Sequence, residues 1–504
     1  MNRVERATTV FSKSWPRVAL LFAAILLLGT AVWVRPQEKP RDQFDGVRAR
    51  IRSLMVEQPV PSVAVAVARD GKILWEEGFG WADIEHRVPA DPHTMYSLAS
   101  ISKPITATGL MVLVERKRVD LDRPINDYLG DAKLTARVGS VADATVRRVA
   151  GHTAGLPLHY QFFYEDEPHR PPSMDETILR YANLVTAPGE RYQYSNLGFG
   201  ILDYVVARAS GKTYDDFMRE EVFLPLRLTR MSVGIAPGLE KYAAARYNRE
   251  GQRLPFYDFD HRGGSAVYAS AHDLVRFGMF HLKAHLPEQR PILSDAAIEE
   301  MQKTGKENYG VGWSTSDAQG FRVVTHGGGM PGVSTTLVLV PSERIALAVL
   351  TNTSGVPLDG VVQEILRALL PKLPPPPART PSAPQEFKPD AALVGNWSGT
   401  VHTYKGDRDL TLRIEESGTV RVRLTQQLWT LLNQVSFRDG TLNGRFSGDI
   451  GTPDASRRPH VIQLSLKLRG DVLNGSAIAM SIPGPRGSNA LTYWAEVKKQ
   501  PEPK

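Results

Sequence analysis

The chain has 504 residues, of which 42% are hydrophobic, so it is long enough for at least two domains with a large core. It contains no cysteine, which excludes disulfides and thiolate metal sites. Its net charge of +7 comes mainly from residues 1–50, where nine Lys/Arg stand against four Asp/Glu, and the nearly neutral remainder gives little support to a nucleic-acid-binding surface.

The N-terminus has the pattern of an export or membrane segment. Four basic residues precede an uncharged apolar run, residues 18–34, which Arg35 follows. Its length is near the lower limit for a membrane-spanning helix and slightly long for the core of a signal peptide. Residues 1–40 are therefore predicted to be an uncleaved transmembrane anchor or a signal cleaved after Ala31. Both alternatives place the rest of the chain in the periplasm or another extracytoplasmic space.

Residues 41–373 mix helical and strand patterns. Apolar residues recur at helical spacing in residues 109–114, 201–209 and 274–281. Strand-like apolar runs occupy residues 62–68, 334–340 and 345–350. This mixture predicts an α/β or α+β domain.

A second domain is predicted after a proline-rich stiff linker, residues 374–386. In residues 387–504 apolar and polar residues alternate at period two, as in half-buried strands. Turns are predicted at Asp439-Gly440, Gly470-Asp471 and Asn474-Gly475. The pattern indicates a small antiparallel β-barrel, in which Trp397 either plugs the base or belongs to a site for one small ligand.

The stretch YSLASISKPITA, residues 96–107, places Lys103 three residues after Ser100, so both can share one face of a helix. A serine hydroxyl needs a base, and a lysine amine can serve if burial or nearby cations lower its pKa. Pro104 marks the start of a helix close to Ser100, because its missing N–H is tolerated in the first turn. The alternative is a capping serine followed by a solvated lysine, since this spacing arises by chance about once in such a chain.

Two further motifs follow. Tyr194 and Asn196 stand in PGERYQYSNLGFGIL, after a Pro-Gly turn and before an apolar run of helical spacing. His326 ends a strand-like run and precedes three glycines in THGGGMPGVSTTLVLV. Their position beside regular elements distinguishes them from two segments of the same spacing. Tyr181-Ala182-Asn183 lies in a predicted amphipathic helix, DETILRYANLV, and His261-Arg262-Gly263 lies in a polar loop.

The order Ser-x-x-Lys, Tyr-x-Asn, His-x-Gly resembles the serine β-lactamase and penicillin-binding protein superfamily. It is most similar to the branch with class C β-lactamases, D-aminopeptidases and related esterases. The resemblance covers about residues 45–370 and includes HTAGLP, GGSAVYASAHDLVRFG and YGVGW. It implies an antiparallel sheet beside a helical region. The Gly395-Asn396-Trp397 opening of the C-terminal strands resembles lipocalin-like barrels, which follow the hydrolase domain in some peptidases of this family.

The resemblance implies a mechanism at Ser100, which would attack a carbonyl and form an acyl-enzyme. Lys103 and Tyr194 would share the acid and base roles, either taking the serine proton, because a tyrosine facing a lysine ammonium has its phenolate favoured. Water would then hydrolyse the acyl-enzyme. No metal or organic cofactor is required.

The resemblance also assigns residues to the substrate. Asn196, His326 and Gly328 would bind and orient it. The backbone N–H groups of Ser100 and Gly329 would form an oxyanion hole.

One departure bears on the substrate. Penicillin-recognising members usually carry Lys-Thr-Gly or Lys-Ser-Gly at the third motif, whereas this chain has His326 and Gly327. A neutral imidazole and a glycine bind a carboxylate less well than a lysine and a hydroxyl residue do. This favours esters or D-amino-acid amides and peptides as substrates. Because histidine can be protonated near pH ~6, any turnover of a carboxylate substrate is expected to improve on mild acidification.

Alternative functions remain at this point. One is a D-alanyl-D-alanine carboxypeptidase or β-lactamase, and another is a non-catalytic protein that binds cell-wall fragments. The expected partners are a small-molecule or short-peptide substrate and, through the N-terminal segment, a membrane, without nucleic acid. The oligomeric state is left open.

Overall fold

The computed structural model describes residues 42–375, 387–484 and 486–501. The predicted anchor or signal, residues 18–34, and most of the proline-rich stretch lie outside the described residues. Within the described ranges no helix combines the length and apolarity that a bilayer crossing requires. The described residues from Gly46 onward belong to a single compact unit.

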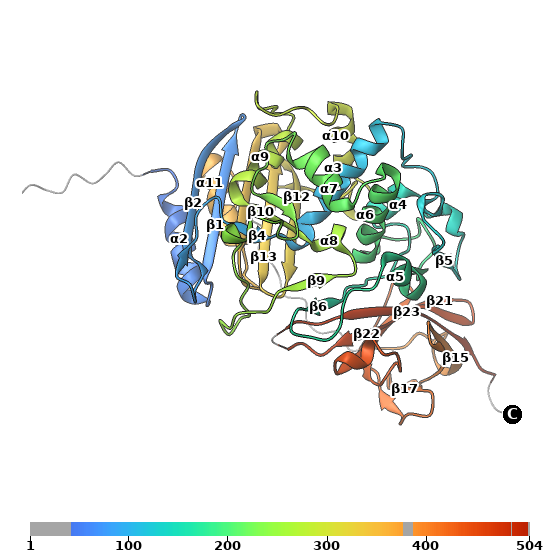
Figure 1. The fold of residues 1–504 in the computed structure, drawn as a ribbon. Coiled ribbons are helices and arrows are strands. Elements are labelled where there is room, and N and C mark those ends of the chain that lie inside the picture. Colours follow the sequence, from blue (N-terminus) through green and yellow to red (C-terminus); the bar gives the residue numbers. More distant parts are fainter. Residues whose placement is uncertain (1–41, 376–386, 485, 502–504) are drawn as a thin grey trace, which may run out of the picture. The chain divides into compact units, whose positions relative to one another are not determined.

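A seven-stranded antiparallel sheet forms the core of the N-terminal part of this unit (Figure 1). Its strands are β1 (Ser62–Arg69), β2 (Lys72–Asp83), β3 (Val88–Pro89), β11 (Ser314–Ala318), β12 (Phe321–Met330), β13 (Val333–Val340) and β14 (Ile345–Thr351). Their order is β11-β12-β13-β14-β1-β2-β3, so the first strands pair with the last. Residues 63–68 of β1 are fully buried, which means that both faces of this strand are covered.

Helices flank the sheet, namely α2 (Asp45–Glu57), α9 (Ala271–His281) and α11 (Asp359–Leu369). Helix α9 packs against β1, β13 and β14, and α11 packs against β14. The three strand runs predicted in this part, and the helix predicted at residues 274–281, are present.

A helical region adjoins the sheet and contains α3 (Ser102–Glu115), α4 (Val146–Ala150), α5 (Met174–Tyr181), α6 (Asn196–Ser210), α7 (Tyr214–Met218), α8 (Arg262–Ser265) and α10 (Asp295–Gln302). Helix α3 is buried on all sides from Ser102 to Leu113, and the polar side chains of its first half have hydrogen-bond partners within the helical region. It contacts both α6 and α8. Helix α6 starts at the side-chain cap of Ser195 and ends at Gly211, which has a φ of +76°.

Short strands join these helices. Strands β4 (Met95–Ser97), β10 (Val267–Ser270) and β8 (Met231–Val233) form a three-stranded sheet. Strand β6 (Phe162–Tyr164) pairs with β9 (Tyr257–Phe259), and β5 (Thr135–Ala136) pairs in parallel with β7 (Asn183–Leu184). The predicted single helix over DETILRYANLV is therefore wrong at its end, because α5 stops at Tyr181 and Asn183 begins a strand.

The C-terminal residues form a nine-stranded antiparallel sheet that curls into a nearly closed barrel, as predicted. Its strands are β15 (Gly395–Thr403), β16 (Gly406–Ile414), β17 (Val420–Leu424), β18 (Thr430–Leu431), β19 (Asn433–Arg438), β20 (Thr441–Ser447), β21 (His460–Arg469), β22 (Val472–Ser481) and β23 (Ala490–Lys499). Their order runs β18-β17-β16-β15-β23-β22-β21-β20-β19, and β18 at one end also contacts β20 near the other. Trp397 is fully buried, and its Nε1 donates to Leu393 O at 2.8 Å, which fits a packing role.

Two of the three turns predicted in the barrel are present, at Asp439-Gly440 and Gly470-Asp471. The third prediction, Asn474-Gly475, is wrong, because both residues lie inside β22. A Cβ atom on Gly475 would lie 2.2 Å from Ser465 O on the neighbouring strand. Glycine is needed at this position because the neighbouring strand lies very close, and not because the chain turns there.

The barrel contacts the segment that leads into β6. Tyr160 and Ala490 exchange two backbone hydrogen bonds, of 3.1 and 2.9 Å. Phe162 N donates to Asn489 Oδ1 at 3.0 Å. Nearby, Glu167 accepts hydrogen bonds from the guanidinium groups of Arg457, at 3.2 Å, and Arg458, at 3.0 Å. The C-terminal strands therefore support residues 160–167.

Candidate active site

The first two sequence motifs meet at Ser100. This residue lies in a 3₁₀ turn, Ala99–Ile101, that leads directly into α3. Its Oγ lies 2.9 Å from Lys103 Nζ, and the hydroxyl of Tyr194 donates to the same oxygen at 2.9 Å. The structure thus brings a serine, a lysine and a tyrosine into one hydrogen-bonded group.

The side chain of Lys103 is completely buried. Its Nζ lies 2.8 Å from Asn196 Oδ1 and 3.0 Å from Gly264 O. Burial holds the pKa of Lys103 well below its usual value. Nζ thus has three polar partners, Ser100 Oγ, Asn196 Oδ1 and Gly264 O, which fix its position beside the nucleophile.

Tyr194 differs from expectation. Burial raises the pKa of its hydroxyl, so the phenol stays protonated and donates to Ser100. Burial opposes the phenolate that a nearby ammonium would favour, because the charged form loses its hydration, and which side chain takes the serine proton stays a prediction.

Strand β12 fixes the backbone around the serine. Ala99 has a φ of +49°, which is uncommon for a residue with a Cβ atom. On β12, a Cβ atom at Gly328 would lie 2.1 Å from Leu98 O and 2.3 Å from Thr335 Oγ1. Thr335 Oγ1 in turn donates to Leu98 O at 2.9 Å. The glycine of the His-x-Gly motif is required because the strand lies directly against the nucleophile segment.

Ser100 opens into a cavity of about 480 Å³. It is lined by Ser100, Leu158, Tyr160, Phe162, Tyr194, Asn196, His261, Ser265, Gly327, Gly329, Met330, Pro331 and Ser488. Ser100 and Gly329, the predicted oxyanion donors, thus border the same space. The walls from residues 158–162 and 330–331 are mostly apolar. Among the described residues that line the cavity there is no lysine or arginine.

His326 does not line this cavity. Its Nε2 lies 2.9 Å from Tyr309 Oη, and its Nδ1 lies 2.8 Å from Gly327 O. Burial, together with the nearby Lys103, lowers the pKa of His326 to about 3. The expected gain of charge on mild acidification is therefore wrong, because this imidazole stays neutral near pH 6.

His152, whose role was not predicted, supports the site. It belongs to the HTAGLP phrase and has a φ of +56°. Its Nδ1 accepts from Ser195 N at 3.2 Å, and its ring lies 4.4 Å from that of Tyr194 and 4.7 Å from that of Tyr309. A conformation unusual for a histidine, next to the Tyr-x-Asn segment, fits a positioning role.

The GGSAVYAS segment makes a second contact that was not predicted. In it, the carbonyl oxygen of Gly264 accepts a hydrogen bond from Lys103. The adjacent Gly263 N donates to Asp203 Oδ2 at 2.5 Å, which fixes α8 against α6. The phrase was recognised in the sequence, but its contact with Lys103 depends on the packing of these helices.

His261, which the sequence assigned to a polar loop, lines the cavity. Its Nδ1 lies 2.8 Å from Asp260 Oδ1, and the other oxygen of Asp260 lies 2.6 Å from His159 Nε2. Although burial works against it, the two histidines hold the pKa of Asp260 below its usual range. Burial lowers the pKa of His261, so its imidazole is neutral. With Nδ1–H donated to Asp260, Nε2 is left as a base.

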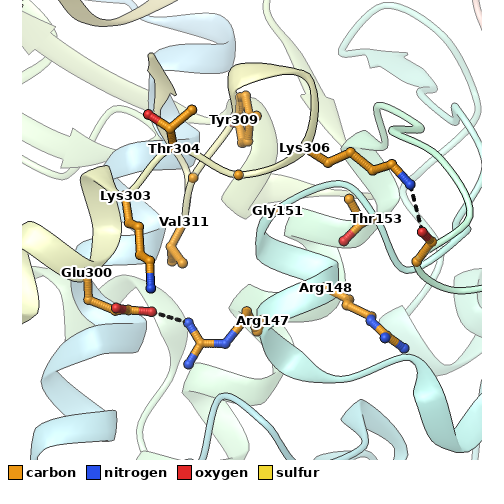
Figure 2. A pocket seen from close by; sticks show the side chains of 13 residues that line it. Arg147, Arg148, Gly151, Thr153, Glu300, Lys303, Thr304, Lys306, Tyr309 and Val311 are labelled. Atoms are coloured by element: carbon orange, nitrogen blue, oxygen red, sulfur yellow. Dashed lines mark hydrogen bonds and ion pairs between the residues drawn. The ribbon is translucent and has the colours of Figure 1, made fainter. Parts of the chain in front are cut away.

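A second cavity, of about 580 Å³, has Tyr309 in its lining (Figure 2). It is basic, with Arg147, Arg148 and Lys306 in its lining. These cations already have internal partners, since Arg147 pairs with Glu300, Arg148 donates to Asp143 O and Lys306 donates to Gly189 O. It contains none of the motif residues.

Comparisons with known proteins agree with this geometry. The family model described as Beta-lactamase matches residues 47–371. Unguisins hydrolase ungD' of Aspergillus campestris is 26% identical over 319 residues, which are 58% of this chain and 59% of that protein. Penicillin-binding protein 4* of Bacillus subtilis is 26% identical over 310 residues, 57% of this chain and 67% of that protein. The chain thus spans about three fifths to two thirds of these relatives.

Solved structures show a similar fold. The octameric penicillin-binding protein homologue from Pyrococcus abyssi has a TM-score of 0.57 and 21% identity, and the match covers 90% of this chain and 99% of that one. SurE has a TM-score of 0.61 and 22% identity, with 89% and 99% covered. A class C β-lactamase has a TM-score of 0.56 and 18% identity, with 66% and 97% covered. At these identities the likeness concerns the fold alone.

Replacing Gly328 by Ala should displace β12 from the nucleophile segment, because the added Cβ atom would overlap Leu98 O. We expect labelling of the protein by a fluorophosphonate to slow by about 100-fold or more. Gly327→Ala is the matched control, since its Cβ atom would have no neighbour nearer than Thr335 O at 3.8 Å. Equal labelling of Gly328→Ala and the wild type would contradict the close contact.

The pH dependence of kcat/KM for a neutral ester should report Lys103. The amine must be unprotonated to act as base, and its pKa is lowered, so the rate should rise with pH on a limb well below 10.5. His326→Gln should leave this limb in place, because His326 titrates only near pH 3. A rate that instead increases between about pH 8 and about pH 6 would show that a protonated histidine takes part.

Proposed function

Because the chain belongs to the β-lactamase family, we propose that it is a serine hydrolase that forms an acyl-enzyme at Ser100 and acts on esters or D-amino-acid amides and peptides. The observation that carries this proposal is the pair of 2.9 Å contacts from Ser100 Oγ to Lys103 Nζ and to Tyr194 Oη, at the wall of a cavity.

In the acylation step, Ser100 Oγ attacks the carbonyl carbon of the substrate and its proton passes to the neutral amine of Lys103. The carbonyl oxygen becomes an oxyanion that accepts from the N–H groups of Ser100 and Gly329. When the intermediate collapses, the bond to the leaving alcohol or amine breaks and the leaving group takes a proton from Tyr194. Lys103 then returns its proton to Tyr194, so the site regains its starting protonation.

In the deacylation step, water attacks the ester bond between the acyl group and Ser100. We assign the base for this water to His261, whose Nε2 is unprotonated while Nδ1–H is held by Asp260. Collapse of the intermediate releases the carboxylic acid, and the proton returns to Ser100 Oγ. Asp260 is a positioning residue that selects the tautomer of His261.

The cavity favours a neutral, apolar acyl group. Tyr160, Phe162 and Met330 supply apolar surface, and the cavity lining, as far as the structure describes it, contains no cation for a carboxylate. His326 stays uncharged and faces Tyr309 rather than the cavity. These features support the preference inferred from the third motif.

The names of similar proteins fit the same class. One relative is a hydrolase of unguisins, and SurE has been solved with D-Leu, an apolar D-amino acid. An acyl group with an apolar side chain is what the Leu158–Phe162 wall would accommodate. A D-alanyl-D-alanine carboxypeptidase or β-lactamase is the alternative, supported by the penicillin-binding relative and disfavoured by the uncharged cavity.

The proposal is tested at Ser100 by intact-mass analysis after fluorophosphonate treatment. One adduct per chain is expected on the wild type and none on Ser100→Ala, because Ser100 stands in the chain's one Ser-x-x-Lys motif with a base in contact. A panel of short-chain p-nitrophenyl esters, D-amino-acid amides, D-Ala-D-Ala peptides and nitrocefin then ranks substrates by kcat/KM. Labelling that persists in Ser100→Ala would refute the assignment of Ser100 as the nucleophile. A preference for nitrocefin would refute the proposed substrate class.

His261→Gln should slow deacylation more than acylation. With a p-nitrophenyl ester, we expect the steady-state rate to fall by about 100-fold while the initial burst remains, so that the acyl-enzyme accumulates in the mass spectrum. Ser265→Ala is the control, because it removes another polar side chain of the cavity lining. Equal losses in both steps would instead indicate that His261 only shapes the cavity.

A further inference from the structure

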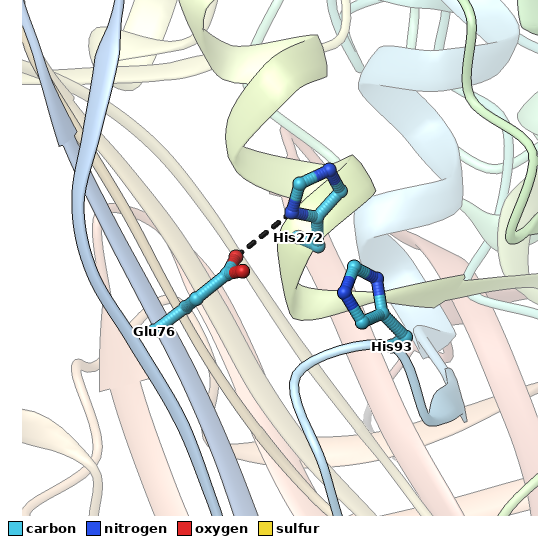
Figure 3. Close-up of side chains that lie close together, drawn as sticks. All are labelled: Glu76, His93 and His272. Carbon is cyan, nitrogen blue, oxygen red and sulfur yellow. Dashed lines mark hydrogen bonds and ion pairs between the residues drawn. The ribbon is translucent and has the colours of Figure 1, made fainter.

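Glu76, His93 and His272 form a cluster outside the active site (Figure 3). One potential ligand atom from each side chain lies within 4.8 Å of the other two. Glu76 Oε2 lies 2.8 Å from His272 Nδ1, and the rings of His93 and His272 are 4.6 Å apart between centroids. In the part of the chain that the structure describes, this is the one such group of three.

The three side chains come from separate segments that are already held in place. Glu76 lies on β2, and His272 lies in the first turn of α9. His93 belongs to the loop before β4, where Asp91 Oδ1 accepts from His93 N at 2.9 Å. His272 N donates to Pro92 O at 3.1 Å, which ties the start of α9 to this loop. The cluster is therefore positioned by backbone contacts that do not use the ligand atoms.

We propose that Glu76, His93 and His272 bind a divalent transition-metal ion, with Zn²⁺ as the best match. Two imidazoles and one carboxylate are ligands that zinc accepts, and they leave a fourth position for water. His93 is exposed and the other two side chains are half-buried, so an ion can enter from solvent. With neutral histidines the cluster carries one negative charge, which favours a cation. Small rotations of the side chains would bring the ligand atoms to bonding distance.

Bound metal would join β2, α9 and the loop that leads through β4 to Ser100. His93 lies two residues before Met95, the first residue of β4. The ion would act as a structural clip, because the cluster lies outside the cavity lining at Ser100. Stabilisation then follows from binding to the folded state alone.

The test uses the untagged full-length chain after treatment with a chelator and dialysis. Titration calorimetry with ZnCl₂ should show one equivalent bound per chain, and saturating zinc should raise the Tm by about 3 °C. His93→Ala should weaken zinc binding by about 10-fold or more and abolish the rise in Tm. Mg²⁺ should not compete, because it prefers oxygen ligands.

His86→Ala is the matched control. His86 Nδ1 lies 3.0 Å from Asp83 Oδ2, a similar pair to His272 and Glu76, but within the described ranges it belongs to no group of three ligands. This variant should bind zinc as the wild type does. Absence of zinc binding, equal binding by His93→Ala, or competition by Mg²⁺ would each overturn the proposal and leave a plain His–Glu hydrogen bond. None of these measurements depends on hydrolysis, so the proposed function is tested separately.

Discussion

The burial of Lys103 is the constraint on which the site depends. An amine without access to water must satisfy its donors internally, and burial also lowers the pKa of Lys103 well below its usual value. Its contacts with Asn196 and Gly264 join α3 to the first residue of α6 and to α8. The same contacts hold Nζ at 2.9 Å from Ser100 Oγ. Packing of the helical region and activation of the serine therefore have one physical origin.

The sequence predicted features that are local in the chain. Ser100 and Lys103 are three residues apart, and the strands show their own periodicity, so both could be found without a structure. The partners of Lys103 could not, because Gly264 lies 161 residues away and contributes only a backbone oxygen. His261 does lie in a loop before α8, but its polar surroundings in the sequence did not indicate that this loop is buried and lines the cavity. Gly475 was misjudged because glycine marks turns and close strand contacts alike.

Charge is excluded from the cavity by several independent features. Burial lowers the pKa of Lys103 and of His326 and raises that of Tyr194, which in each case disfavours the charged form. Asp260, whose pKa is held below its usual range, is enclosed by His159 and His261 and does not line the cavity. In such surroundings the oxyanion of the tetrahedral intermediate would be the main charge to appear. Preorganised N–H donors have their greatest effect in a medium of this kind.

The pairing of β23 with the segment before β6 joins two parts of the chain that are synthesised at very different times. Phe162 N and Asn489 Oδ1 are 327 residues apart in the chain, yet they meet where Tyr160 and Phe162 line the cavity. A growing chain emerges from the ribosome N-terminus first, so the helical region and the sheet are made before their C-terminal support. The contacts of this wall with residues 489 and 490 form only after β23 has emerged. A chain cut short before β23 would therefore hold Ser100 beside a wall that lacks this support.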